Sequence, residues 1–184
     1  GRIAGEDAVD YVDGLGLPDY DAEQVRRERE RYEAPLRRAS GLQASKVEYK
    51  LRRMVNDYLQ PPKVTRKMEI GLRRFAEIRE DVEHIKAENP HELMRAMEVQ
   101  AILDCAELAA HASLYRTESR WGLYHYRTDY PERDDARWNC FVEVRKGAGG
   151  EPELFRRDIP DYVVPIDESE KNAYNELRIE AAHA

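Results

Sequence analysis

The chain has 184 residues, of which 30 are Lys or Arg and 37 are Asp or Glu, so its formal net charge is −7. Because 41% of the residues are apolar, the composition excludes a disordered acidic tail and predicts a globular protein with a packed core. The two cysteines, Cys105 and Cys140, are too few for a disulfide framework and are not spaced as paired metal ligands. We therefore expect a reducing, cytoplasmic setting.

The first 16 residues predict the end of a helix. Apolar residues recur at helical spacing between Ile3 and Val12, and Gly14 and Gly16 supply stop signals. No start signal precedes them, so we expect this stretch to be the end of a helix that belongs to a preceding domain.

A second helix is expected from Ala22 to about Arg38, with Asp19 or Asp21 as its cap and Pro35 as a terminator or kink. It lies in a basic block, residues 26–53, in which ten Lys and Arg residues are interleaved with four glutamates. Opposite charges at i,i+3 and i,i+4 spacing are typical of a solvated helix. We therefore predict no nucleic-acid partner.

Two further helices carry much of the predicted core. One spans Ala44–Leu59 and ends at Pro61-Pro62, and the other spans Thr65–Lys86 with Thr65 as its cap. Their apolar residues recur on one face at helical spacing. These residues are Val47, Leu51, Met54, Val55, Tyr58 and Leu59 in the first helix, and Met68, Leu72, Phe75, Ile78, Val82 and Ile85 in the second.

The fifth helix has the clearest start, because Asn89, Pro90 and Glu92 combine a capping residue, a proline at the first helical position and an acid three residues after the cap. From Leu93 to Leu114 only a narrow stripe is polar, which predicts a central rod surrounded by other helices. Cys105 would then be buried. Charged residues interrupt the stretch, so no membrane span is predicted.

The helical period is lost after Ser119. Trp138–Lys146 alternates apolar and polar residues, a glycine-rich stretch follows at 147–150, and Glu151–Arg157 completes a predicted β-hairpin. The tail from Asp158 is expected to be irregular, with a short closing helix over Glu168–Ala182. The predicted fold class is mainly α, a helical bundle with a small β-hairpin appendage and an irregular C-terminal tail. The expected divisions are residues 1–16, 17–119 and 120–184, the last of them packed on the bundle.

Signatures of catalysis are missing from the sequence. The glycines at 147–150 lack the spacing of a phosphate-binding loop, and the histidines do not pair at metal-ligand spacing. From the residues we therefore predict no nucleotide-binding site and no metal site in this chain.

The segment 116–135 is unusually rich in arginine, acidic and aromatic residues. Such a segment is stable when half-buried only if its charges pair or bind backbone groups, which arginine does well. The interpretation that we favour is a polar structural motif that fastens an irregular stretch to the bundle or to a neighbouring domain. The other is an anion site made by Arg116, Arg120, His125 and Arg127. The motif comprises Arg116, Glu118, Ser119, Arg120, His125, Arg127, Asp129, Arg133, Asp134 and Asp135.

This segment and the helix before it resemble a known family. The run NPHELMRAMEVQAILDCAELAAHASLYRTESRWGLYHYRTDYPERDDARW, residues 89–138, is similar to the C-terminal region of the flavoprotein subunits of fumarate reductase and succinate dehydrogenase. Aspartate oxidase and the alpha subunit of adenylylsulfate reductase belong to the same group. The shared pattern is Arg-x-Glu-Ser-Arg, then Gly and His, then Arg-x-Asp-Tyr-Pro-x-Arg-Asp-Asp and Trp. The opening GRIAGEDAV is similar to the end of the last helix of the family's FAD-binding domain.

The resemblance implies a C-terminal helical domain that buttresses the FAD-binding domain of the same parent protein, an FAD-dependent oxidoreductase, and is not catalytic alone. In this family the flavin and the substrate-binding residues lie N-terminal to the matching region, so the resemblance implies no catalytic and no cofactor-binding residue in this chain. It also implies an iron–sulfur subunit or ferredoxin as electron partner, in the cytoplasm or at the membrane periphery. Arg120 and its neighbours are assigned to the interdomain contact.

One departure concerns the substrate of the parent protein. Most dicarboxylate-reducing members read Ser-Arg-Gly-x-His, whereas residues 119–125 here are two residues longer, with Trp121 after Arg120. A tryptophan at this place is more similar to the adenylylsulfate reductase branch.

Two other functional hypotheses stay open at this point. The first is a stand-alone helical module that binds a protein or an anion through the 116–135 surface. The second is an enzyme in its own right, with an anion site lined by arginine and histidine.

Overall fold

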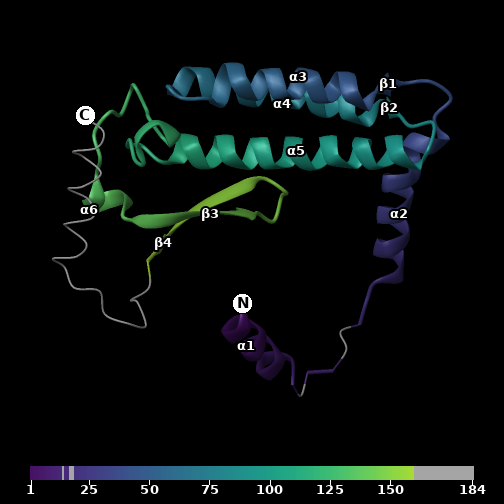
Figure 1. The fold of residues 1–184 in the computed structure, drawn as a ribbon, viewed down its shortest axis with the longest axis horizontal. Helices are drawn as coiled ribbons and strands as arrows, with labels where there is room; N and C mark the ends of the chain where they lie inside the picture. Colours follow the sequence, from purple (N-terminus) through teal and green to yellow (C-terminus); the bar gives the residue numbers. More distant parts are fainter. Residues whose placement is uncertain (14, 17–18, 160–184) are drawn as a thin grey trace. The chain divides into compact units, whose positions relative to one another are not determined.

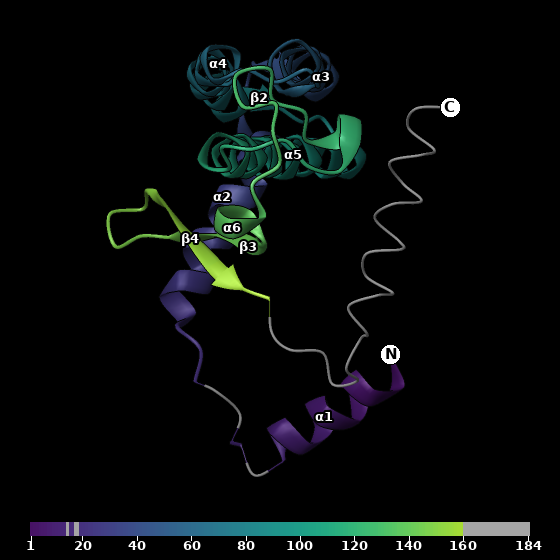
Figure 2. The ribbon, with the colours of Figure 1, turned by 90° about the vertical axis from the view of Figure 1, so that its left-hand side faces the viewer.

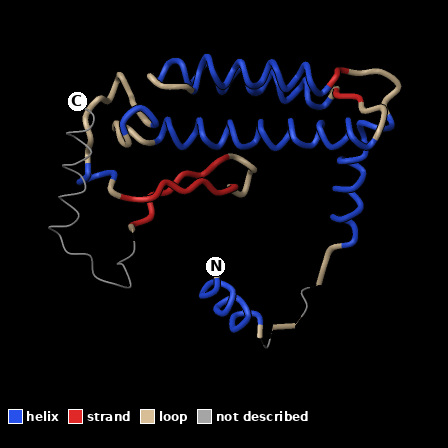
Figure 3. Tube along the Cα trace, in the orientation of Figure 1, coloured by secondary structure: helices blue, strands red, loops and turns tan. Residues whose placement is uncertain are grey.

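The computed structural model describes residues 1–13, 15–16 and 19–159. The expected closing helix at 168–182 lies outside these residues, as does the tail from residue 160 onward. Within the described residues the chain is mainly helical and contains two small two-stranded sheets (Figures 1 and 3). The predicted fold class is therefore confirmed. The elements are α1 (Arg2–Val12), α2 (Ala22–Arg37), β1 (Leu42–Gln43), α3 (Ala44–Leu59), α4 (Thr65–Glu83), β2 (Ile85–Lys86), α5 (Pro90–Tyr115), the 3-10 helix η1 (Gly122–Tyr124), α6 (Asp135–Trp138), β3 (Cys140–Lys146) and β4 (Pro152–Asp158).

The chain forms two compact units, which are described separately. Unit 1 comprises Gly1–Tyr49 and Arg79–Ala101, and unit 2 comprises Lys50–Ile78 and Ile102–Ala184. Because α3, α4 and α5 are long helices, each contributes residues to both units.

In unit 1 the end of α4 is set by strand pairing. β1 and β2 pair in parallel, with Leu42 opposite Ile85, and the Leu42 N–H donates to the His84 carbonyl at 2.8 Å. The Arg38 guanidinium also donates to the Ile85 carbonyl. The predicted end of this helix at Lys86 is therefore wrong, because α4 stops at Glu83 where the backbone turns to pair with a distant segment.

The α2 helix is stabilised by its own charges. Asp21, and not Asp19, caps it by accepting from the N–H groups of Glu23 and Gln24. Pro35 lies inside its last turns without ending it, and the helix has no buried residue. The pattern of a solvated helix is confirmed by i,i+3 and i,i+4 ion pairs, namely Arg26 with Glu23 and Glu30, Arg31 with Glu28, and Arg37 with Glu33.

In unit 2, α3 and α4 lie side by side over α5 (Figures 1 and 2). Their close approach depends on Gly71, because a Cβ there would lie 2.9 Å from the Tyr58 Cβ on α3. The predicted apolar faces of α3 and α4 supply this core. Its fully buried side chains are Leu51, Met68, Phe75, Ile78 and Leu103, and Leu59, Ala106 and Ala110 are also buried.

The α5 helix begins as predicted, since the Asn89 side chain accepts from the Glu92 N–H at 3.0 Å. Among the described residues, however, it is not surrounded on all sides. Its buried residues recur every three or four positions as one stripe, Ala96, Val99, Leu103, Ala106 and Ala110. Met94 and Leu108, on other faces, are 51% and 47% exposed. The expected burial of Cys105 is wrong for the same reason, because its thiol lies on the exposed side.

The predicted hairpin forms from β3 and β4, which pair antiparallel with Phe141 opposite Arg157. Trp138, expected to open the first strand, instead ends the short helix α6. The Asp134 side chain caps α6 by accepting from the Arg137 N–H, and this turn places the Trp138 ring in the interior, where it is 2% exposed.

We predict that Gly71→Ala lowers stability although alanine is the better helix former. The added Cβ forces Tyr58 or the α3 backbone to move, which costs about 1–3 kcal/mol. Gly5→Ala in α1 is the matched control, because no atom of the described residues lies within 4 Å of its added Cβ and the helix propensity gain is about 1 kcal/mol. Urea unfolding midpoints measure both changes. Equal midpoints for the Gly71 variant and the wild type would contradict the close approach.

Candidate functional site

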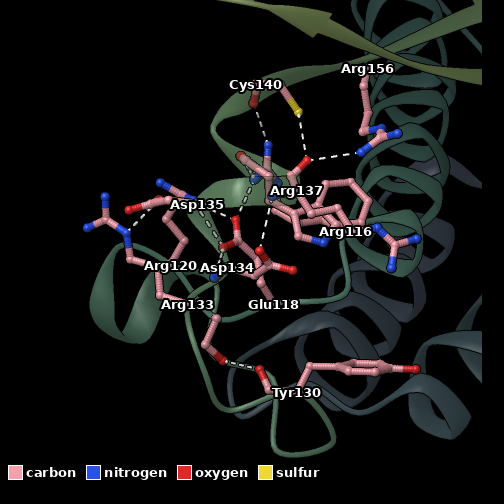
Figure 4. A network of polar contacts seen from close by, with 12 residues as sticks. Arg116, Glu118, Arg120, Tyr130, Arg133, Asp134, Asp135, Arg137, Cys140 and Arg156 are labelled. Carbon is pink, nitrogen blue, oxygen red and sulfur yellow. Dashed lines mark hydrogen bonds and ion pairs between the residues drawn. The ribbon is translucent and has the colours of Figure 1, made fainter.

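The buried Glu118 carboxylate lies at the centre of the polar segment (Figure 4). Its Oε1 accepts from Arg116 Nη1 and Arg120 Nε, both at 2.6 Å. Its Oε2 accepts from Arg120 Nη2 at 3.0 Å and from the Asp134 N–H at 2.9 Å. Burial alone would raise the pKa of Glu118, but the hydrogen bonds from Arg120, the Asp134 backbone and Arg116 outweigh it and leave that pKa lowered. Glu118 is therefore a carboxylate with four donors around it.

Arg116 connects the end of α5 to α6 and β3. Its Nη1 also donates to the Trp138 carbonyl at 2.8 Å, and its Nη2 donates to the Cys140 carbonyl at 2.7 Å. The guanidinium lies over the Trp138 ring, 5.4 Å from the centroid, and Tyr115 contacts the same ring edge-on. Arg116 thus donates to two backbone carbonyls where α6 leads into β3.

Arg127 is fully buried and uses all five of its N–H groups. Nε and Nη2 donate to the two oxygens of Asp129 at 2.9 and 2.8 Å. Nη1 donates to the carbonyls of Ser113 at 2.7 Å and Arg116 at 3.0 Å, and Nη2 also donates to the Thr65 hydroxyl at 2.7 Å. Arg127 therefore fastens its own loop to the start of α4 and the end of α5.

Asp129 has a second role, which corrects the predicted cap of α4. Its Oδ2 accepts from the Thr65 N–H at 2.9 Å and from the Thr65 hydroxyl. Thr65 is therefore the first residue of the helix, and the capping carboxylate comes from a residue 64 positions later. The hydrogen bonds from Arg127 are the main cause that lowers the pKa of Asp129, and those from Thr65 add to it.

Ser119 and His125 hold the loop from the inside. Ser119 Oγ accepts from the Arg127 N–H at 2.8 Å and donates to the Tyr130 carbonyl at 2.9 Å. His125 is 6% exposed, and its Nε2 has no partner among the described residues. Burial, followed by the positive charge of Lys63, lowers the pKa of His125 to about 4. His125 is therefore a neutral imidazole at pH 7.

The outer part of the segment is more exposed. Asp135 accepts from Arg120 Nη2 at 2.6 Å and from Arg133 Nε at 2.8 Å. Arg133, followed by Arg120, lowers the pKa of Asp135. The Asp134 carboxylate does not pair with an arginine in the described part of the chain, because it caps α6.

All ten predicted motif residues thus lie in unit 2 within this one set of contacts, which we call the arginine network. Sequence reasoning missed three participants, Lys63, Ser113 and Thr65 as a donor. Trp138 was part of the family pattern, but it was expected to open the first strand. Lys63 and Thr65 directly follow Pro61-Pro62. The two prolines mark a loop before a helix, and this was the signal in the sequence that could have pointed to both residues. Ser113 contributes its carbonyl to Arg127 and its hydroxyl to Lys63, and no pattern in the sequence marked it for either contact.

The arrangement fastens chain segments together and leaves little capacity for an anion. Every N–H of Arg127 is used, and Arg116 and Arg120 share Glu118. In the described residues no group of His, Cys, Asp or Glu side chains could hold a metal ion. No helix in this part of the chain is long and apolar enough to cross a membrane.

The helices that the arginine network joins lie in a region that matches a known protein family. The family described as "Fumarate reductase flavoprotein C-term" matches residues 48–172. This match covers more than half of the chain, and the chain belongs to this family.

Relatives come from several enzymes. The adenylylsulfate reductase subunit alpha of Megalodesulfovibrio gigas is 33% identical over 92 residues, which is 49% of this chain and 14% of the relative. The adenylylsulfate reductase structure from Archaeoglobus fulgidus has a TM-score of 0.81 at 26% identity, over 89% of this chain and 29% of that chain. An E. coli quinol fumarate reductase shares the fold with a TM-score of 0.75 at 21% identity, over 89% of this chain and 29% of its own. The chain thus spans less than a third of the proteins it matches.

We predict that Glu118→Ala costs about 3–5 kcal/mol, because it leaves buried guanidinium groups without their carboxylate. Arg120→Ala in the same background should cost less than it does alone, with a coupling energy of about 1–3 kcal/mol. Glu77→Ala is the control, since its pair with Arg74 is about half exposed on both sides and should cost about 0–1 kcal/mol. Urea unfolding of the four-variant cycle measures these values. Additive losses at 118 and 120 would contradict the shared carboxylate.

We predict that stability falls as the pH is lowered from 7 to 5, in part because of His125. The unfolded chain takes up a proton near its ordinary pKa of about 6.5, whereas the folded chain resists protonation until about pH 4. The unfolded state therefore binds more protons in this window, and the loss is about 2 kcal/mol. Unfolding free energies across this window should give a flatter profile for His125→Gln than for the wild type. Parallel profiles would show that His125 is not held neutral.

Proposed function

We propose that this chain is the helical C-terminal domain of an FAD-dependent oxidoreductase subunit, that it buttresses the flavin-carrying part of the same polypeptide, and that it does not catalyse a reaction alone. Family membership over residues 48–172 carries the proposal. The arginine network supports it, because its charges are used to hold segments of the domain together and not to receive a substrate.

Within the family, we favour the adenylylsulfate reductase branch as the one to which the parent protein belongs. Two observations support this choice: the 33% identity to the M. gigas subunit, and Trp121 in a segment two residues longer than in dicarboxylate reductases. In this proposal the parent passes an electron pair between FAD and a small anionic acceptor in the cytoplasm. An iron–sulfur subunit or ferredoxin exchanges electrons with the flavin.

Flavin content tests the assignment. The 184-residue chain, purified alone, should show no visible flavin absorbance, whereas the longer polypeptide that contains it should carry FAD. Stoichiometric FAD on the isolated chain would overturn the proposal. A native start codon directly before Gly1 would instead favour a stand-alone binding module.

A further inference from the structure

We propose that residues Trp121 to Tyr124, here called the apolar tip, form the contact through which this domain docks onto the flavin-carrying part of the same polypeptide. This inference rests on the proposed function. It assigns the docking role to a few exposed apolar side chains next to the arginine network, while the arginines themselves act inward.

The apolar tip exposes large side chains to an unusual degree. Trp121 is 58% exposed, Leu123 is 79% exposed and Tyr124 is 86% exposed. Tryptophan and tyrosine are the residues most enriched among those that dominate interface energies. Trp121 and Tyr124 are of this kind, and with Leu123 they place three exposed apolar side chains on four consecutive residues, which indicates a contact surface.

The apolar tip is also held in one conformation. The Arg120 N–H donates to the His125 carbonyl at 3.0 Å, which closes the loop, and the Tyr124 N–H donates to the Trp121 carbonyl at 3.2 Å. Arg120 and His125, on either side, are anchored in the arginine network. Trp121 has a φ of 58°, and a bulky residue keeps this left-handed conformation only when its surroundings enforce it. A preorganised surface loses less entropy on docking.

A groove next to the apolar tip extends the apolar surface. It has a volume of about 500 Å³ and is lined by Leu123, Tyr124, the end of α3 and the Pro61-Pro62 turn. Lys63 is its cationic residue. The Lys63 ammonium donates to Ser113 Oγ at 3.0 Å but has no carboxylate partner among the described residues. Burial, with Arg127 nearby, lowers the pKa of Lys63. The surface therefore complements an apolar patch that carries a carboxylate.

The flavin-carrying part fits this surface better than a second copy of the chain. In the matched structures about 70% of the polypeptide lies outside the region that this chain covers. That remainder is tethered to the domain, so its effective concentration is high. Two copies of a chain with a net charge of −7 repel each other instead.

Hydroxyl-radical footprinting with mass spectrometry tests the contact in the isolated chain and in the full-length polypeptide. Trp121 and Tyr124 should be oxidised at least tenfold more slowly in the full-length polypeptide. Equal oxidation rates in the two proteins would overturn the inference. Protection that appears only when a separate subunit is added, or only when the isolated chain is concentrated, would also overturn it. FAD on the full-length polypeptide with an unprotected tip would leave the proposed function intact.

A double variant, Leu123→Asp with Tyr124→Asp, gives a second readout. Both side chains are largely exposed, so the isolated chain should melt at the wild-type temperature. The full-length polypeptide should melt about 5 °C lower, because two charges then enter an apolar contact. Tyr49→Asp, at a residue that is 69% exposed, is the matched control. An unchanged melting temperature in the full-length polypeptide would overturn the inference.

Discussion

The structure of unit 2 depends on one buried carboxylate shared by two arginines. Glu118 holds Arg116 and Arg120 in fixed positions, and through them it connects the end of α5, the loop at 120–125 and the turn into α6. Arg127 does the same for the start of α4. Because these charges lie away from water, each must find its partners, so only one arrangement of the irregular segment satisfies them all.

Such a network is a costly way to gain stability, and its value lies in specifying geometry. A buried ion pair repays its desolvation only when every remaining donor and acceptor is satisfied. Arg127 meets this condition, because its five N–H groups donate to the side chains of Asp129 and Thr65 and to two backbone carbonyls. The result is an irregular segment held at several points by side-chain contacts, which is what presenting a small contact surface requires.

Sequence patterns correctly predicted those features of the fold that depend on contacts between residues close together in the chain. The start of α5, the full span of α3 and the ion pairs of α2 depend on residues within four positions of one another, and these features agree with the structure. The end of α4 and its cap depend on β1 and on Asp129, which no local pattern reveals. Composition marked the ten motif residues of the arginine network, but it revealed neither their pairing nor the participation of Lys63, Thr65 and Ser113. Asp134, an apparent partner for arginine, caps a four-residue helix instead.

The distant cap of α4 has a consequence for the order of folding. The first turn of this helix lacks its carboxylate until the segment around Asp129 has docked, which requires closing a loop of 64 residues. Closing so long a loop is an entropic barrier, and contacts of large sequence separation form late. The α4 N-terminus should therefore fray in early intermediates and become protected from hydrogen exchange only together with the loop that carries Arg127 and Asp129.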